Sequence, residues 1–250
     1  MRSYTLEVCV DAVESALAAA QGGGTRLELC SNLVIGGTTP SLELFRTVRD
    51  CVDLEINVLI RPRFGDFLYT GHELTIMRRE IEAFAKAGAH GVVIGCLCSD
   101  GRLDRSALGD LIAAAQGCSV TLHRVFDVCG DPFQAMEQAA ELGVDTILTS
   151  GQEADCWQGR KLLAQLIHRA PEGLAILIGA GVTPEVIAEI LSLMPARHFH
   201  MSGKVVLESG MTYRNPRVHM GLPGLSEFQI YRTDPAAVAQ AAQLLKQAWE

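Results

Sequence analysis

The sequence predicts a (β/α)8 barrel, in which eight parallel strands form a closed ring and a helix follows each strand. Short apolar runs that suit buried strands begin near Leu6, Arg26, Glu55, Gly91, Ser119, Thr146, Ala175 and His198. Consecutive starts lie 20 to 36 residues apart, which leaves room for one helix and two short loops. A doubly wound open sheet is disfavoured, because no G-x-G-x-x-G fingerprint follows the first strand at Cys9-Val10-Asp11.

Amphipathic stretches fill the intervals and carry signals for the ends of helices. We expect helices over residues 13–21, 41–52, 73–87, 105–116, 132–142, 157–169 and 184–193. Thr39-Pro40, Asp131-Pro132 and Thr183-Pro184 each place a capping residue before a proline, which is typical of a helix N-terminus. Gly88 and Gly143 stand just before a predicted strand, where helices commonly end.

The chain of 250 residues is expected to form a single domain, residues 1–250. The barrel covers about residues 5–203, and a C-terminal extension covers 204–250. The extension lacks the strand–helix alternation until a final helix over about 235–249. Residues 209–228 are rich in Gly, Pro and polar residues, and we expect an irregular segment that covers the barrel mouth or contacts a partner subunit.

Composition and charge exclude several classes of function. The net charge of −8 argues against a nucleic-acid surface, which would be basic. The chain has no apolar run of about 18 residues or more, so we expect no membrane-spanning helix. Asp11 and Glu14 interrupt the order expected of a secretory signal. Eight cysteines without an export signal predict a cytoplasmic protein with free thiols or metal ligands rather than disulfides.

Polar and sulfur-containing residues gather at the C-terminal ends of the predicted strands, where barrels of this class hold their sites. This set contains Glu7, Cys9, Glu28, Cys30, Arg61, Arg63, Cys96, Cys98, His123, Arg124, Ser150, Gly181, His200 and Ser202. His198 and His200 share one face of the last strand, and we expect one in the core and the other near the mouth. The pattern predicts a functional site at this end of the barrel.

Two neighbouring strands repeat one pattern, Leu6-Glu7-Val8-Cys9 and Leu27-Glu28-Leu29-Cys30. Residues two apart on a strand face the same side, and neighbouring strands lie about 4.8 Å apart. Two sulfurs on opposite sides of one ion are separated by roughly twice 2.3 Å, and soft sulfur ligands select Cu(I). Cys9 and Cys30 are therefore candidate copper ligands. The alternatives are two small buried hydrophobic residues or a catalytic thiol activated by a nearby cation.

The charged residues at the same strand ends admit a different function, that of an enzyme acting on a small anionic substrate. In this interpretation Glu28 and His123 transfer protons. The substrate is held by Glu7, Arg61, Arg63, Arg124, Ser150, Gly181 and Ser202. Loops after the seventh and eighth strands, which contain Gly181 and Ser202, often hold anions in such barrels. The alternative without catalysis is a structural ion network, in which the arginines neutralise the two glutamates.

The chain resembles the CutC family, named for copper homeostasis, in segments that are highly specific when taken together. They are Leu6-Glu7-Val8-Cys9, Leu27-Glu28-Leu29-Cys30, Gly36-Gly37-Thr38-Thr39-Pro40-Ser41, Ile60-Arg61-Pro62-Arg63, Gly65-Asp66-Phe67-Leu68-Tyr69, Thr121-Leu122-His123-Arg124-Val125-Phe126-Asp127, Leu148-Thr149-Ser150-Gly151, Gly179-Ala180-Gly181 and Ser209-Gly210-Met211-Thr212-Tyr213-Arg214-Asn215. They extend from residue 6 to about residue 215, which is most of the chain.

The resemblance implies a (β/α)8 fold, a homodimer and a cytoplasmic role in copper handling. It also implies that Cys9 and Cys30 are the ligands of Cu(I). The chain departs from the family pattern at Phe64, which replaces a glycine, and at Cys96 and Cys98, where cysteines are not expected.

Overall fold

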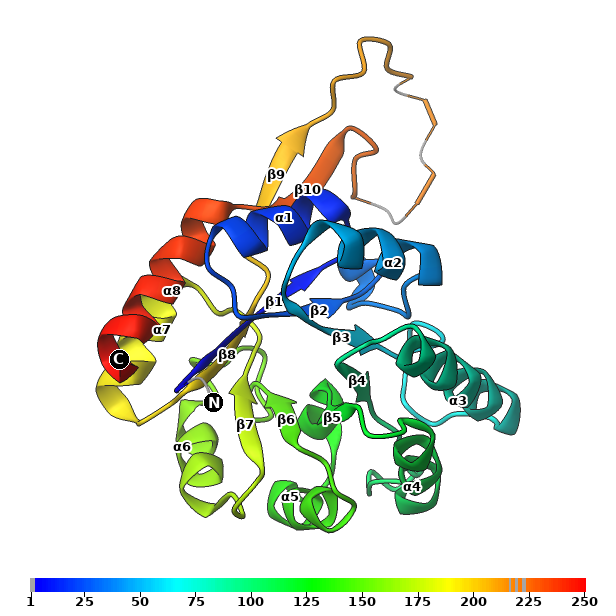
Figure 1. Ribbon diagram of the computed structural model, residues 1–250, viewed down its shortest axis with the longest axis vertical. Helices are drawn as coiled ribbons and strands as arrows, with labels where there is room; N and C mark the ends of the chain where they lie inside the picture. The colour runs from blue at the N-terminus through cyan, green and yellow to red at the C-terminus, as the bar shows by residue number, and fades with distance from the viewer. Residues whose placement is uncertain (1–2, 216, 219, 222–223) are drawn as a thin grey trace.

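Eight parallel strands form a closed barrel in the computed structural model, in the order β1 to β8 around the ring (Figure 1). The structure describes residues 3–215, 217–218, 220–221 and 224–250. The strands are β1 (Thr5–Val10), β2 (Arg26–Leu29), β3 (Glu55–Leu59), β4 (Gly91–Ile94), β5 (Ser119–Leu122), β6 (Thr146–Thr149), β7 (Ala175–Ile178) and β8 (His198–Met201). Each begins within one residue of its predicted start, so the predicted (β/α)8 barrel is confirmed.

Helices surround the barrel. They are α1 (Val13–Gln21), α2 (Leu42–Cys51), α3 (Gly71–Lys86), α4 (Arg105–Ala114), α5 (Pro132–Glu141), α6 (Arg160–Arg169), α7 (Pro184–Leu193) and α8 (Pro235–Trp249). All of those named here except α1 and α6 are capped at the N-terminus by a side chain. Asp131 and Thr183 cap α5 and α7 as predicted. Helix α2 agrees within one residue with the predicted helix 41–52, but its capping residue is Ser41 and not the predicted Thr39, since Ser41 accepts the hydrogen bond of Leu44 N–H.

The barrel has an apolar outside and a polar inside. Outward residues of the strands, such as Leu6, Val8 and Leu27, pack with the buried faces of the helices into one hydrophobic core. Buried polar residues on the strands include Glu7, Glu28, Asn57, Thr121 and Thr146. A barrel interior this polar is costly unless its groups find partners, so these residues need an explanation in terms of contacts or ligands.

The register between strands decides which of these residues face one another. Along β1 and β2, Glu7 pairs with Arg26 and Cys9 pairs with Glu28. Closure of the barrel pairs Glu7 with His200 of β8. Closing a barrel requires such a staggered register, and the stagger offsets the two Glu-x-Cys patterns by one strand repeat of two residues.

The C-terminal extension begins with a hairpin that the sequence did not predict. Its strands β9 (Lys204–Glu208) and β10 (Gln229–Thr233) pair antiparallel, and the described part of residues 209–228 contains no helix or strand. Residues 216, 219 and 222–223 of that predicted irregular segment lie outside the described residues.

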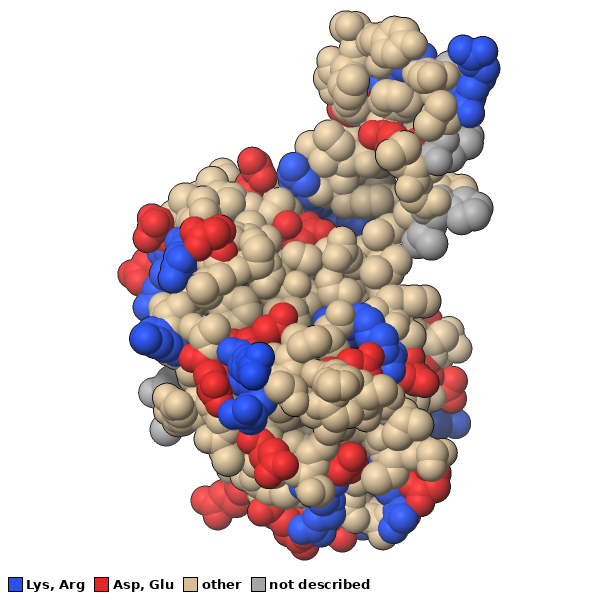
Figure 2. All heavy atoms as spheres, turned by 90° about the vertical axis from the view of Figure 1, so that its right-hand side faces the viewer, with Lys and Arg blue, Asp and Glu red and all other residues tan. Residues whose placement is uncertain are grey.

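The hairpin projects away from the barrel beyond α1 (Figure 1), and the face of the projection turned to the viewer in Figure 2 is mostly uncharged. None of the described residues of 209–228 lines the pocket at the barrel mouth, so the expectation that this segment covers the mouth is not met, and the hairpin reaches the pocket only through Lys204 and Val205 of β9. Helix α8, predicted correctly, contacts α7 and α1 and completes the ring. None of the described helices is long and apolar enough to cross a membrane.

Candidate functional site

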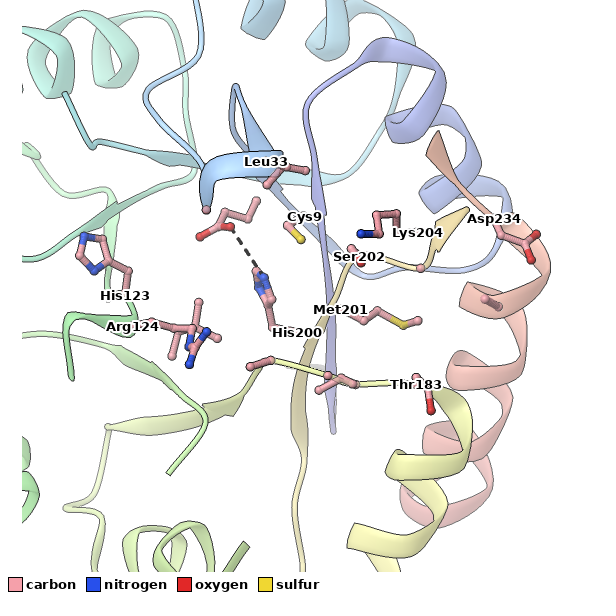
Figure 3. Close-up of a pocket in the computed structure, with 18 of the residues that line it drawn as sticks. Cys9, Leu33, His123, Arg124, Thr183, His200, Met201, Ser202, Lys204 and Asp234 are labelled. Atoms are coloured by element: carbon pink, nitrogen blue, oxygen red, sulfur yellow. Dashed lines mark ion pairs between the residues drawn. The ribbon is translucent and has the colours of Figure 1, made fainter. Parts of the chain in front are cut away.

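A pocket of about 690 Å³ opens at the C-terminal ends of the strands (Figure 3). Among the predicted site residues, it is lined by Cys9, Glu28, Arg61, His123, Arg124, Gly181 and Ser202. Phe67, His200 and Lys204 also line it, and none of these three belongs to the predicted ligand sets. Glu7, Cys30, Arg63 and Ser150 lie outside the lining. The structure thus brings seven of the predicted residues to one cavity.

Glu7 lies below the pocket floor, fully buried, and orients His200. Arg26 Nε donates to Glu7 Oε2 at 2.6 Å, and Glu7 Oε1 lies 2.8 Å from His200 Nδ1. Burial alone would raise the pKa of Glu7, but Arg26 and His200 lower it to about 2. An ionised Glu7 therefore holds the proton on His200 Nδ1 and leaves Nε2 to face the pocket.

Cys9, Glu28 and His200 form a compact group of candidate ligands. One donor atom from each lies within 4.8 Å of the other two. The line drawn in Figure 3 joins Glu28 Oε2 to His200 Nε2, which are 3.8 Å apart. Burial raises the pKa of Glu28. Burial disfavours charged His200, yet the neighbouring Cys9, Glu28 and Glu7 raise its pKa well above the ordinary value. The pKa values of Glu7 and Glu28 are thus moved in opposite directions.

Cys30 does not pair with Cys9, which corrects the arrangement expected from the repeat. The stagger of β1 against β2 places Glu28, not Cys30, opposite Cys9. Cys30 lies fully buried against Leu59 and Val93, and its Sγ is 3.3 Å from Glu28 Oε2. Burial raises the pKa of the Cys30 thiol well above its ordinary value. Cys30 therefore supports Glu28 from behind and does not line the pocket.

Arg61 is a buried cation held by backbone carbonyls. Its terminal nitrogens donate to Gly36 O at 3.3 Å, Gly37 O at 3.0 Å and Gly65 O at 2.9 Å. Within the described chain it forms no ion pair, and its Nε has no hydrogen-bond partner. Its guanidinium carbon lies 5.1 Å from the centre of the Phe67 ring. The charge of Arg61 is thus left uncompensated beside the pocket.

His123, the predicted proton carrier of the enzyme interpretation, is a neutral hydrogen-bond donor in the ligand-free structure. Its Nδ1 accepts from Val125 N at 3.0 Å, which places the ring proton on Nε2. Burial and the nearby Arg61 lower the pKa of His123 to about 3. Nε2 is buried and has no partner among the described residues. A group with this pKa remains neutral at physiological pH.

Arg124 and Ser150 belong to one network with Asp127. Arg124 Nε donates to Asp127 Oδ2 at 2.7 Å, and its Nη2 donates to Ser150 Oγ at 3.0 Å. Ser150 itself donates to Asp127, so it positions Arg124 rather than lining the cavity. In Figure 3, the Arg124 side chain lies between His123 and His200.

The remaining residues predicted to bind an anion are Arg63, Gly181 and Ser202. Arg63 is tied to Asp66 at 2.9 Å and to Glu73, away from the pocket. Gly181 and Ser202 line the opposite lip, and Gly181 has a left-handed φ of 71°. That lip also contains the carboxylates of Glu185 and Asp234 and the ammonium of Lys204, so it has charges of both signs.

His200 is the central residue that was left out of the predicted ligand sets. The sequence could have pointed to His200, because closure of the barrel makes the last strand a neighbour of the first, which carries Glu7 and Cys9. His200 occupies the mouth end of β8, whereas His198 is deeper and its Nδ1 lies 3.0 Å from Thr5 Oγ1. This division between the two histidines is the one expected from the sequence.

Comparison with known proteins assigns the chain to a family. Residues 4–205 match the model of the CutC family. A CutC family protein from Histophilus somni is 39% identical over 97% of this chain and 99% of its own. The copper homeostasis protein cutC homolog of Mus musculus is 40% identical over 94% of this chain and 87% of its own.

Solved structures agree with this assignment. The crystal structure of a CutC protein from Streptococcus agalactiae has a TM-score of 0.75 and 28% identity, and it covers 80% of this chain and 98% of its own. A thiamine phosphate pyrophosphorylase from Pyrococcus furiosus, at 13% identity and a TM-score of 0.59, shares the fold alone. The chain belongs to the CutC family of copper homeostasis proteins.

Proposed function

We propose that the chain binds one thiophilic metal ion, Cu(I) in keeping with the family's role, through Cys9, Glu28 and His200. The observation that carries this proposal is that the three donor atoms lie within 4.8 Å of one another. The 3.8 Å between His200 Nε2 and Glu28 Oε2 is too long for a hydrogen bond. It is close to the separation of about 3.4 Å between two atoms bound about 2.1 Å from one ion at a tetrahedral angle.

The surroundings of His200 support the same site. A metal-bound histidine usually donates its other ring N–H to a carboxylate, which orients the ring. Glu7 occupies that position at 2.8 Å, and Arg26 in turn holds Glu7. The thiolate and the imidazole suit both Cu(I) and Zn²⁺, whereas the carboxylate of Glu28 is a usual ligand of Zn²⁺ and a poor one for Cu(I). Because the ligands must lose their protons, metal binding should release protons.

Anaerobic titration with Cu(I), and separately with Zn²⁺, tests this site on the wild type and two variants. Cys9→Ser should weaken the affinity by about 100-fold or more, because it removes a direct ligand. Cys30→Ser is the matched control and should weaken the affinity much less than Cys9→Ser, since Cys30 is not a direct ligand and serine keeps a hydrogen-bond donor to Glu28. An equal loss in both variants would favour the paired-cysteine site. Unchanged affinity in Cys9→Ser would rule out both.

The pocket also favours a second function, that of an enzyme on a small anionic substrate. Its volume of about 690 Å³ suits a small molecule and far exceeds what one ion needs. Glu28 and His200 would then transfer the proton, since their pKa values are both raised and both groups face the cavity. His123 would donate a hydrogen bond to the substrate. Binding of a small anion is the first requirement of this function.

The proposed setting is the cytoplasm, with the chain as a homo-oligomer. All eight cysteines are free, which suits a reducing compartment. Val206, Leu207 and Ile230 of the hairpin are exposed apolar residues, and a second subunit is expected to cover them. Light scattering after size-exclusion chromatography measures the number of subunits.

A further inference from the structure

Two buried donors in the pocket wall have no acceptor. Arg61 Nε and His123 Nε2 are shielded from solvent, and neither has a partner among the described residues. Asn57 and Tyr69 also carry polar atoms without a hydrogen-bond partner, and the Tyr69 phenol lies close enough to Arg61 to feel its charge, but only Arg61 and His123 of these four line the pocket. Buried polar groups are nearly always paired, so two exceptions on one wall of a cavity point to a missing ligand.

Phe67 joins the two donors into one surface. Its ring centre lies 5.1 Å from the guanidinium carbon of Arg61 and 5.0 Å from the centre of the His123 ring. The loop that carries Phe67 is held in place, because Leu97 N donates to Phe67 O at 2.9 Å. Arg61, Phe67 and His123, together with Arg124, are called the donor wall below.

The donor wall presents donors and positive charge, with no acceptor of its own aimed at a ligand. Backbone carbonyls hold the ends of Arg61, while Asp127 and Ser150 hold one edge of Arg124. The Arg124 side chain remains 44% exposed, so its guanidinium is accessible from the cavity. A group that only accepts hydrogen bonds and carries negative charge complements this set.

We propose that the donor wall binds the oxyanion of a small organic acid or phosphate ester, and that the rest of that molecule extends over Cys9, Glu28 and His200. The ligand class follows from the chemistry of the wall, and the pocket of about 690 Å³ has room for a molecule larger than a bare ion. The inference deepens the enzyme function and rests on it for any reaction, but the anion binding itself requires no metal.

Isothermal titration calorimetry of the metal-free protein with malonate, and separately with inorganic phosphate, tests the donor wall. At least one anion should bind at millimolar concentration. Arg61→Gln should weaken that binding by about tenfold or more, since it removes a charged donor. Arg63→Gln is the matched control, because Arg63 is two residues away and bonded to Glu73, and it should change the affinity by about twofold at most.

A second variant and a spectroscopic measurement keep the proposal testable if Arg61→Gln does not fold. His123→Gln keeps the net charge of the neutral imidazole and should also weaken binding. In ¹⁵N-labelled wild type, the Nε2 resonance of His123 should shift when the anion binds. Absence of binding by both anions, or equal losses in Arg61→Gln and Arg63→Gln, would overturn the proposal.

These outcomes are separable from those of the metal titration. If Cu(I) fails to bind while an anion binds, only the metal site is lost. If Cu(I) binds while neither anion does, the donor wall and the enzyme function that requires an anion are both lost, and the metal site stands.

Discussion

The two walls of the pocket treat buried charge in opposite ways. On one side, Arg26, Glu7, His200 and Glu28 form a chain of opposite charges, here called the ion cluster. On the other side, the donor wall leaves Arg61 Nε and His123 Nε2 without acceptors. The ion cluster compensates its own charge, whereas the donor wall relies on a molecule that enters from outside.

This difference separates a stabilising element from a binding element. Breaking a buried pair leaves an uncompensated charge, which is strongly destabilising. An unpaired donor already lowers stability in the ligand-free protein and regains it when an acceptor binds. Substitutions in the ion cluster should therefore affect folding first, and substitutions in the donor wall should affect binding first.

The largest effect is expected from Glu7→Gln. Loss of this fully buried carboxylate leaves Arg26 and protonated His200 without their shared partner. The free energy of unfolding should fall by about 3–5 kcal/mol, measured by urea denaturation at neutral pH. Glu43→Gln is the control, because Glu43 forms an exposed ion pair with Arg46, and it should change stability little. A small loss in Glu7→Gln would mean that the cluster does not stabilise the fold.

The next largest effect is expected in how the difference in unfolding free energy between the wild type and Glu7→Gln changes at acid pH. The pKa of Glu7 falls from 4.5 to about 2 on folding, so its stabilisation is fully present above pH 4.5 and is lost as the pH falls toward 2. The contribution is about 3 kcal/mol. Unfolding free energies of the wild type and Glu7→Gln should converge over this window. A difference that stays constant with pH would show that the ionised form of Glu7 is not the stabilising one.

The smallest effect is expected from Phe67→Leu in the donor wall. This change removes the ring that contacts Arg61 and His123 and should cost about 1 kcal/mol of stability in thermal denaturation. The affinity for the anion should fall about threefold, since Arg61 loses support. Phe64→Leu alters a 66% exposed ring in the same loop and should change neither quantity. Equal effects of the two substitutions would show that Phe67 has no specific role in supporting the donor wall.

Much of the fold and the location of the site could be predicted because their signals are local. Strand starts such as Arg26, Glu55 and Gly91 follow from short apolar runs, and the helices between them follow from amphipathic periodicity. Hairpin strands β9 and β10 were missed because they project from the barrel and are mostly exposed, so their residues do not alternate between a buried and a solvated face.

The composition of the site could be predicted only in part. Cys9, Glu28, Arg61, His123 and Arg124 reach one cavity as expected from their place at the strand ends. His200 was undervalued because its partners, Glu7 and Glu28, lie more than 170 residues away in the chain and meet it only when the barrel closes.

By itself the sequence determined the eight-strand barrel, the end at which the pocket opens and most of the residue types around it. These properties depend on hydrophobic periodicity, helix capping and strand order, which are set by residues close together in the sequence. Only the tertiary structure decided that Cys9 faces Glu28 rather than Cys30, because the stagger of neighbouring strands is a property of closure. It alone also decided that backbone carbonyls hold Arg61 beside the pocket while Arg63 is bound to Glu73, because partners depend on how the loop after β3 packs.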